Sequence, residues 1–101
     1  MSNFILNEAY ELVRSAGLVS NESEFSEDWI GYSECYLRTL RFKNAVPSIG
    51  SIAVLASRLQ RAGEQMIPTR RYRQLGLRFI DMSEKCHASV NEDAVELDLA
   101  E

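Results

Sequence analysis

Apolar residues recur every three to four positions along most of the chain, which is the spacing of amphipathic helices. This pattern predicts five helices, at about residues 4–16, 23–30, 34–43, 48–62 and 69–87. The last of them carries the clearest apolar stripe, which consists of Tyr72, Leu75, Phe79, Met82 and Cys86. No segment shows the strict alternation of a strand, so the sequence predicts an all-α fold.

The predicted helix ends follow from residues that favour caps and turns. Gly17 suits the left-handed position just past the first helix, and Gly63 is expected to end the fourth. Ser23 and Ser33 are expected to cap the N-termini of the second and third helices. The dipeptide Pro47-Ser48 opens the fourth helix. These signals divide the chain into short helices joined by brief turns.

Charge is distributed unevenly along the 101 residues, although the formal net charge is only -4. Residues 1–37 carry a net charge of -6, residues 38–78 carry +8, and residues 79–101 carry -6. A basic block of this size is typical of a surface that binds a polyanion. The alternative is a solvated helical surface whose arginines pair with the acidic flanks.

The sequence changes character near its C-terminus. From Ala88 onward large apolar residues are scarce, whereas Glu and Asp are frequent. We therefore expect a single domain over residues 1–88 and a flexible acidic tail over residues 89–101.

Nothing in the sequence indicates a membrane protein or an exported one. No apolar run approaches the roughly 18 residues that cross a bilayer, and the N-terminus lacks the pattern of a signal peptide. Two cysteines, Cys35 and Cys86, are too few for a disulfide framework. These features predict a soluble, cytoplasmic protein.

The sequence contains no recognisable catalytic, metal or cofactor site. Cys86 and His87 are adjacent, but no second pair of ligands stands at the spacing of a zinc site. No Ser or Cys nucleophile stands in a recognisable arrangement with His87, the sole histidine. Gly50 and Gly63 are isolated and form no phosphate-binding loop. We expect neither an enzyme nor a cofactor.

The middle of the chain carries the pattern of a helix-turn-helix, in which a turn containing Gly joins two short helices and the second helix is basic. Residues 31–59, GYSECYLRTLRFKNAVPSIGSIAVLASRL, resemble the phage-repressor-like helix-turn-helix regulators of the xenobiotic-response-element family. That family's pattern is roughly Gly-x-Ser-x-x-Tyr-(Ile/Leu)-x-x-Leu, then a turn, then Pro-Ser-(Leu/Ile)-x-x-Leu-x-x-Leu-Ala-x-x-Leu. The segment matches it without a gap. The resemblance covers about residues 4–62 and implies a lambda-repressor-like domain of a bacterial or phage transcription regulator.

The chain departs from the family pattern at three places. The connector between Leu18 and Phe25 is longer, and the second helix holds one residue more between Phe25 and Gly31. Lys43-Asn44 stands where the family has a glycine, and Asn tolerates the left-handed conformation that such a turn uses. These departures bear on the angle of the second helix.

The resemblance implies that the helix at 34–43 enters the major groove of duplex DNA. Glu34 would accept from a cytosine amine, Thr39 would meet a thymine methyl group or a base acceptor, and Arg38 would reach guanine or phosphate. Arg41 and Lys43 would neutralise phosphates. The residues expected to contact DNA are Ser23, Ser33, Glu34, Cys35, Arg38, Thr39, Arg41, Lys43 and Asn44.

A second copy of the chain is a further expected partner. Regulators of this type bind paired half-sites about 34 Å apart, so we expect a homodimer. The apolar stripe of the last helix could form the dimer contact, or it could close the core of the monomer. The candidate dimer residues are Tyr72, Leu75, Phe79 and Met82.

The acidic flanks and Glu34 leave other functions open. Acidic surface that faced DNA would oppose binding, so the scaffold could instead serve a protein-binding adaptor or antiactivator. In a third alternative, residues 90–101 compete with DNA for the arginines and inhibit binding.

Overall fold

The computed structural model describes the backbone of residues 2–100 and the side chains of residues 5–92. This part of the chain contains helices and turns but no strand. The elements are α1 (Ser2–Ser15), α2 (Glu22–Phe25), the π-helix η1 (Ser26–Ile30), α3 (Tyr36–Lys43), α4 (Ile49–Met66), the 3-10 helix η2 (Arg70–Tyr72) and α5 (Arg73–Ala100). The all-α class and the five predicted helices are confirmed, with α2 and η1 together forming the second.

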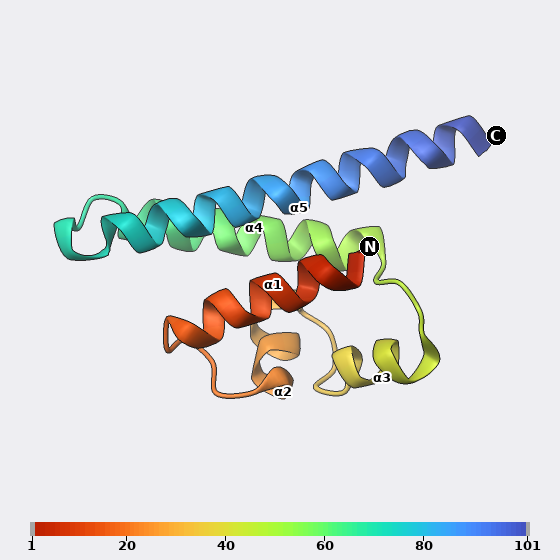
Figure 1. Cartoon of the computed structure of the whole chain (residues 1–101), viewed down its shortest axis with the longest axis horizontal. Helices are drawn as coiled ribbons and strands as arrows, with labels where there is room; N and C mark the ends of the chain where they lie inside the picture. Colours follow the sequence, from red (N-terminus) through yellow and green to blue (C-terminus); the bar gives the residue numbers. More distant parts are fainter. Residues whose placement is uncertain (1, 101) are drawn as a thin grey trace.

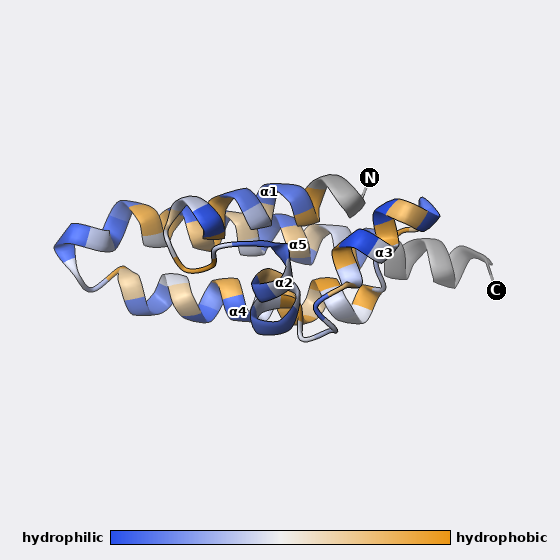
Figure 2. Ribbon diagram, turned by 90° about the horizontal axis from the view of Figure 1, so that it is seen from below, coloured by the Kyte–Doolittle hydropathy of each residue, from blue (hydrophilic) through white to orange (hydrophobic). Residues whose placement is uncertain are grey.

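The two longest helices, α4 and α5, run antiparallel along the length of the molecule (Figure 1). α1 packs against α5, and η1 packs against α4. Figure 2 shows hydrophobic and hydrophilic residues interleaved along α1 and α4, as amphipathic helices require. α3 lies near the start of α4, at the end of the molecule away from the α4–α5 turn (Figure 1).

The core lies where α1, η1, α4 and α5 meet. Phe25 and Phe79 are its largest fully buried side chains. The Tyr10 ring meets Phe25 edge-on at 5.5 Å, and the Trp29 ring meets Phe79 edge-on at 6.0 Å. The other fully buried apolar side chains include Leu6, Val13, Ile30, Ile52, Leu55 and Leu59. The apolar faces that the sequence pattern predicts therefore form one core.

The prediction that Gly63 ends the fourth helix is wrong, because α4 continues to Met66. Gly63 is buried against α5, where a Cβ on it would lie 2.8 Å from the Gly76 carbonyl oxygen. A Cβ on Gly76 would in turn lie 2.9 Å from the Gly63 carbonyl oxygen. The two glycines let the backbones of α4 and α5 approach closely. Nearby, Ser83 Oγ donates to the carbonyl of Ala56 at 2.7 Å and joins the same two helices.

The last helix also continues beyond its predicted end at residue 87, since α5 reaches Ala100. Residues 88–100 contain neither Gly nor Pro, and extending an existing helix is far easier than nucleating one. The predicted flexible tail is therefore not confirmed, and the side chains of residues 93–101 lie outside the described residues. Although α5 has 28 residues, no helix in the described part of the chain is both long and apolar enough to span a bilayer.

Half of the predicted dimer stripe lies in the monomer core. Phe79 is fully buried and Met82 is 5% exposed within the single chain, while Leu75 is half-buried. Tyr72 is the one of the four that is largely exposed. Phe79 and Met82 are therefore not available for a dimer contact, because they close the core between α5 and the other helices.

Candidate nucleic-acid interface

α3 has one face turned to the core and one face turned to solvent, as its apolar spacing predicts. Leu37 and Leu40 are buried. On the opposite side, Arg38, Thr39 and Phe42 are exposed, and the Phe42 side chain keeps 92% of its accessible surface. We call the exposed residues Cys35, Arg38, Thr39 and Phe42 the outer face of α3.

A π-turn connects the second helix to the turn before α3. In η1 the backbone N–H of Gly31 donates to the carbonyl of Ser26, and Tyr32 N–H donates to the same carbonyl at 3.0 Å. A π-turn takes one residue more than an α-turn. This is how the lengthened segment between Phe25 and Gly31 fits while Phe25 and Ile30 stay buried. Gly31 then leaves the helix at φ 79°, in the left-handed region.

Two tyrosines tie the start of α3 to the start of α4. The Tyr36 hydroxyl accepts from the Ser48 N–H at 3.2 Å and donates to Ser51 Oγ at 3.2 Å. The Tyr32 hydroxyl lies 3.0 Å from Ser48 Oγ, and the two tyrosine rings are 4.4 Å apart. Ser48 Oγ also accepts from the Ser51 N–H and caps α4. The orientation of α3 is thus set by hydrogen bonds as well as by Leu37 and Leu40.

Replacing Tyr36 by Phe is expected to lower the free energy of unfolding by about 1–2 kcal/mol, because the Ser48 N–H loses its acceptor and Ser51 Oγ loses the donor from Tyr36, keeping only its bond to the Ser48 carbonyl. Urea denaturation measures the change. Tyr10→Phe is the control, since the Tyr10 ring packs on Phe25 but its hydroxyl makes no hydrogen bond among the described residues. Equal stability of the two variants would contradict the role assigned to the Tyr36 hydroxyl.

The N-termini of the second and third helices differ from their predicted positions. Asn21, not Ser23, caps α2, since its Oδ1 accepts from the Glu24 N–H at 3.0 Å. Glu24 Oε1 reaches back to the Ser20 N–H at 2.7 Å, which completes a reciprocal cap. Ser23 is half-buried inside the first turn, among carboxylates that oppose a phosphate.

The third helix begins at Tyr36, so Ser33 does not cap it with its hydroxyl. Instead the Ser33 carbonyl accepts from the Tyr36 N–H at 3.0 Å. Glu34 and Cys35 lie in the exposed turn just before the helix. The end of α3 is as predicted, because Asn44 adopts the left-handed conformation at φ 51°.

The charged residues of α3 differ in how they are paired. Arg41 forms an ion pair with Glu22, which joins α3 to α2 and offsets the charge of Arg41. Arg38 Nη2 donates to Cys35 Sγ at 3.5 Å, and no ion pair links Arg38 to Glu34 among the described residues. Lys43 is exposed and likewise has no carboxylate partner among them. Arg38 and Lys43 are therefore the cations of α3 that have no carboxylate partner among the described residues.

Arg58 has a structural role that the sequence did not reveal. Its Nη1 donates to the carbonyl of Asp28, in the middle of η1, at 2.6 Å. A Cβ on Gly31 would lie 3.5 Å from Arg58 Nη2, so the guanidinium also lies against the turn. Asp28 and Arg58 are 30 positions apart, and no local signal could have paired them.

Six of the nine basic residues of the block form two clusters, while Arg58 and Arg61 lie exposed on α4 and Arg78 lies exposed on α5. Arg38, Arg41 and Lys43 lie on α3, whereas Arg70, Arg71 and Arg73 lie at the α4–α5 turn, at the other end of α4 (Figure 1). An α-helix rises about 1.5 Å per residue, so the 18 residues of α4 separate the two clusters by about 27 Å. The α3 cluster and the cluster at the α4–α5 turn are therefore distinct.

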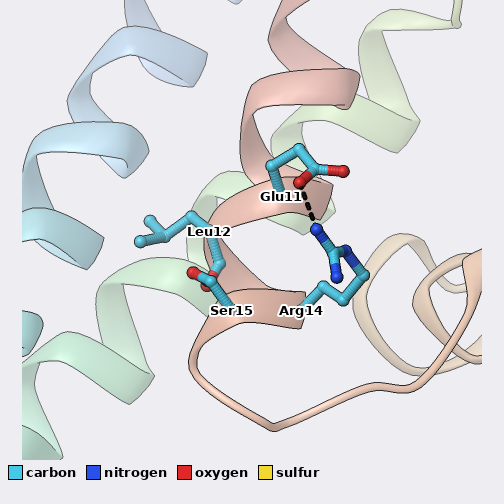
Figure 3. A network of polar contacts seen from close by, with 4 residues as sticks. All are labelled: Glu11, Leu12, Arg14 and Ser15. Atoms are coloured by element: carbon cyan, nitrogen blue, oxygen red, sulfur yellow. Dashed lines mark hydrogen bonds and ion pairs between the residues drawn. The ribbon is translucent and has the colours of Figure 1, made fainter.

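The groove between α1 and α5 has mixed charge and does not resemble a ligand site. It has a volume of about 620 Å³ and is lined by Glu8, Glu11, Arg78 and Lys85, among others. Lys85 pairs with Glu8 at 3.3 Å. Glu11 accepts from Arg14 at 2.6 Å (Figure 3), and this hydrogen bond raises the pKa of Arg14 above its ordinary value. Among the described residues, no cluster of His, Cys, Asp and Glu could hold a metal ion.

The two cysteines stand in opposite environments. Cys35 is exposed just before α3, whereas Cys86 is fully buried in α5. Burial, and to a smaller extent the Glu8 carboxylate, raises the pKa of the Cys86 thiol to about 12. Because the thiolate is the reactive form, Cys86 is inert near neutral pH.

Iodoacetamide is therefore expected to alkylate Cys35 rapidly in the native protein and Cys86 only after unfolding. Peptide mass spectrometry after timed labelling, with and without denaturant, distinguishes the two sites. Equal native rates at Cys35 and Cys86 would contradict the burial of Cys86.

Comparison with known proteins places this arrangement in one family. The sequence model of a protein family, described as a family of unknown function (DUF6626), matches residues 6–99. No curated protein and no solved structure matches the chain. The matched segment runs from α1 through almost all of α5 and so includes the residues beyond the predicted domain end at 88. The chain therefore belongs to DUF6626, a family of unknown function.

Proposed function

We propose that this protein is a sequence-specific DNA-binding regulator that places α3 in the major groove. The observation that carries the proposal is the outer face of α3, which is exposed while Leu37, Leu40 and Tyr36 hold the opposite side. An α-helix is about 10–12 Å across with its side chains, and the major groove is about 12 Å wide. The resemblance of residues 31–59 to helix-turn-helix regulators supports the same assignment.

Chemistry suggests a role for two residues of the outer face, Arg38 and Thr39, and for charged and polar residues beside it. The Arg38 guanidinium suits the paired acceptors of guanine, and Thr39 suits a thymine methyl group or a base acceptor. Glu34 can accept from a cytosine amine. Lys43 and the Asn44 region contact phosphates, which position the helix without reading sequence. Arg41 holds α3 against α2 through Glu22, and we assign it no phosphate.

Selection of bound duplexes from a random pool tests this function. We expect enrichment of a common sequence, and an affinity that falls by about 0.9 log units per log unit of salt for each phosphate contacted. Binding to no duplex at low salt would overturn the proposal. The mass of the free and bound protein, measured in the same samples, tests the proposed homodimer on half-sites about 34 Å apart.

Thr39→Ala is expected to change the preferred sequence more than the overall affinity, because one hydroxyl and one methyl group read a single base pair. Selection with the variant should relax one position of the wild-type site. Thr69→Ala, in the exposed α4–α5 connection, is the matched control and should leave the selected site unchanged. An identical site for Thr39→Ala and wild type would remove Thr39 from the groove.

A second candidate function, a protein-binding adaptor, is favoured by one observation. Phe42 is 92% exposed and Val46 is 68% exposed, at and just after the end of α3. Apolar side chains this accessible are typical of surfaces that a protein covers. A stoichiometric protein partner that survives nuclease treatment and is lost in Phe42→Ala would favour this function.

A further inference from the structure

The connection between α4 and α5 carries a second cationic surface, separate from α3. Arg70 and Arg71 lie in the 3-10 helix η2, and Arg73 opens α5. All three are exposed. Between them, Tyr72 is 46% exposed, and the Arg71 guanidinium carbon lies 5.6 Å from the centre of its ring. We call Arg70, Arg71 and Arg73 the arginine tip.

The backbone of the arginine tip is held in a fixed shape. Thr69 N–H donates to the Met66 carbonyl at 3.1 Å, and Tyr72 N–H donates to the Thr69 carbonyl at 2.9 Å. Arg73 Nε donates to the Ile67 carbonyl at 3.1 Å. The close contact of α4 and α5 at Gly63 secures the base of the turn. A ligand would therefore meet a preorganised backbone, which lowers the entropic cost of binding.

The charge of the arginine tip is not offset within the described part of the chain. The described residues form three ion pairs, Arg14 with Glu11, Arg41 with Glu22, and Lys85 with Glu8. None of these ion pairs involves the arginine tip. Residues 60–78 contain Glu64 as their one acid, and Glu64 accepts from Gln60 at 3.4 Å. Three exposed arginines within four residues and without a counter-charge favour binding of an anion.

We infer that the arginine tip binds the phosphate backbone of a nucleic acid. A 3-10 helix rises about 2.0 Å per residue, so Arg70 and Arg73 are about 6 Å apart along the turn. One strand of a duplex carries a phosphate about every 3.4 Å of its axis, which matches this density of charge. The guanidinium fork binds phosphate oxygens in pairs, and the exposed Tyr72 ring adds a surface against the sugar-phosphate chain.

The distance between the tip and α3 sets where this contact falls. The position of this contact relative to α3 rests on the proposed function, whereas phosphate binding by the arginine tip does not. A separation of about 27 Å along α4 corresponds to about eight base pairs. The tip therefore contacts phosphates beyond the segment that α3 reads, or it contacts a second duplex. In both cases it adds affinity and salt dependence but no sequence preference.

The test measures how the affinity for one duplex of arbitrary sequence depends on salt concentration. Three proteins are compared: the wild type, the triple variant R70A/R71A/R73A and the double variant R70A/R71A. The double variant leaves the bond from Arg73 to Ile67 intact. We expect the slope of log affinity against log salt to fall by about 2–3 in the triple variant. The lysine variant R70K/R71K/R73K should keep most of the slope, and Gln74→Ala should keep all of it. Circular dichroism checks that each variant is folded.

The outcomes separate this inference from the proposed function. A lower slope in the tip variants, together with no loss of affinity for the selected duplex in Arg38→Ala, supports the tip and overturns the role of α3. Unchanged slopes in both tip variants overturn the tip, whatever Arg38→Ala does. Wild-type binding to vesicles that contain phosphatidylserine, without binding to duplex, would assign the tip to a lipid headgroup and overturn the inference.

Discussion

Gly63→Ala is expected to lower the free energy of unfolding by about 1–3 kcal/mol, which is the usual cost of overpacking a core. The new Cβ would lie 2.8 Å from the Gly76 carbonyl oxygen and 2.9 Å from two atoms of Ile80. The Ile80 side chain can rotate, but the carbonyl belongs to the backbone of α5. The helices must therefore separate. This cost exceeds the gain of up to about 1 kcal/mol that alanine brings to a helix interior.

Gly50→Ala is the matched control, because it makes the same chemical change near the start of the same helix. A Cβ on Gly50 would meet no atom within 4 Å. We expect this variant to be as stable as the wild type or more stable, by up to about 1 kcal/mol. Urea denaturation of both variants gives the comparison. Equal effects at Gly63 and Gly50 would show that α4 and α5 do not approach at Gly63.

Arg38→Ala is expected to lower affinity for the selected duplex by about 5-fold to 150-fold, the equivalent of the 1–3 kcal/mol of one bidentate base contact. Arg38 is exposed on the outer face and has no carboxylate partner among the described residues, so its loss removes a contact rather than a fold-stabilising pair. Specificity should relax at one base pair.

Arg78→Ala is the control for Arg38→Ala, because it removes the same charge from α5, beside α1 and away from α3. We expect a change of less than about twofold, since a distant surface charge acts through a screened field. Equal losses in the two variants would mean that net charge governs binding, and that α3 is not a reading helix.

The helices could be predicted because each one carries its own apolar spacing. The stripe on α3 placed Leu40 inward and Arg38 and Thr39 outward, and the structure agrees. The left-handed conformation of Asn44 could also be expected from a local property, because Asn tolerates this conformation. The predicted elements and the exposure of the candidate site thus depend on residues that are close in sequence.

The errors arise where a residue acts on a distant part of the chain. A glycine that ends a helix and a glycine that admits a neighbouring helix look alike in sequence, and Gly63 is of the second kind. The ion pair of Arg41 with Glu22, which lies on a different helix, was not predicted. Arg58 likewise supports the turn before α3 through a residue that is 30 positions away. Pairings of this kind depend on the packing of helices, which local spacing does not encode.

The division of the basic block has the same origin. Summed charge over residues 38–78 suggests one cationic face, but α4 carries the chain from one end of the molecule to the other. The result is α3 at one end and the arginine tip at the opposite end. The two clusters differ in their expected effects, since under the proposals α3 would set sequence preference and the tip would add salt dependence.

The alkylation rate of Cys35 in the presence of a selected duplex tests the central claim most directly. Cys35 lies on the outer face of α3, and the buried Cys86 does not react in the native protein, so the rate reports on α3 alone. We expect the rate to fall in proportion to the fraction of protein bound and to recover when salt releases the DNA. A duplex that binds the protein while Cys35 reacts as fast as in the free chain would contradict the placement of α3 in the groove.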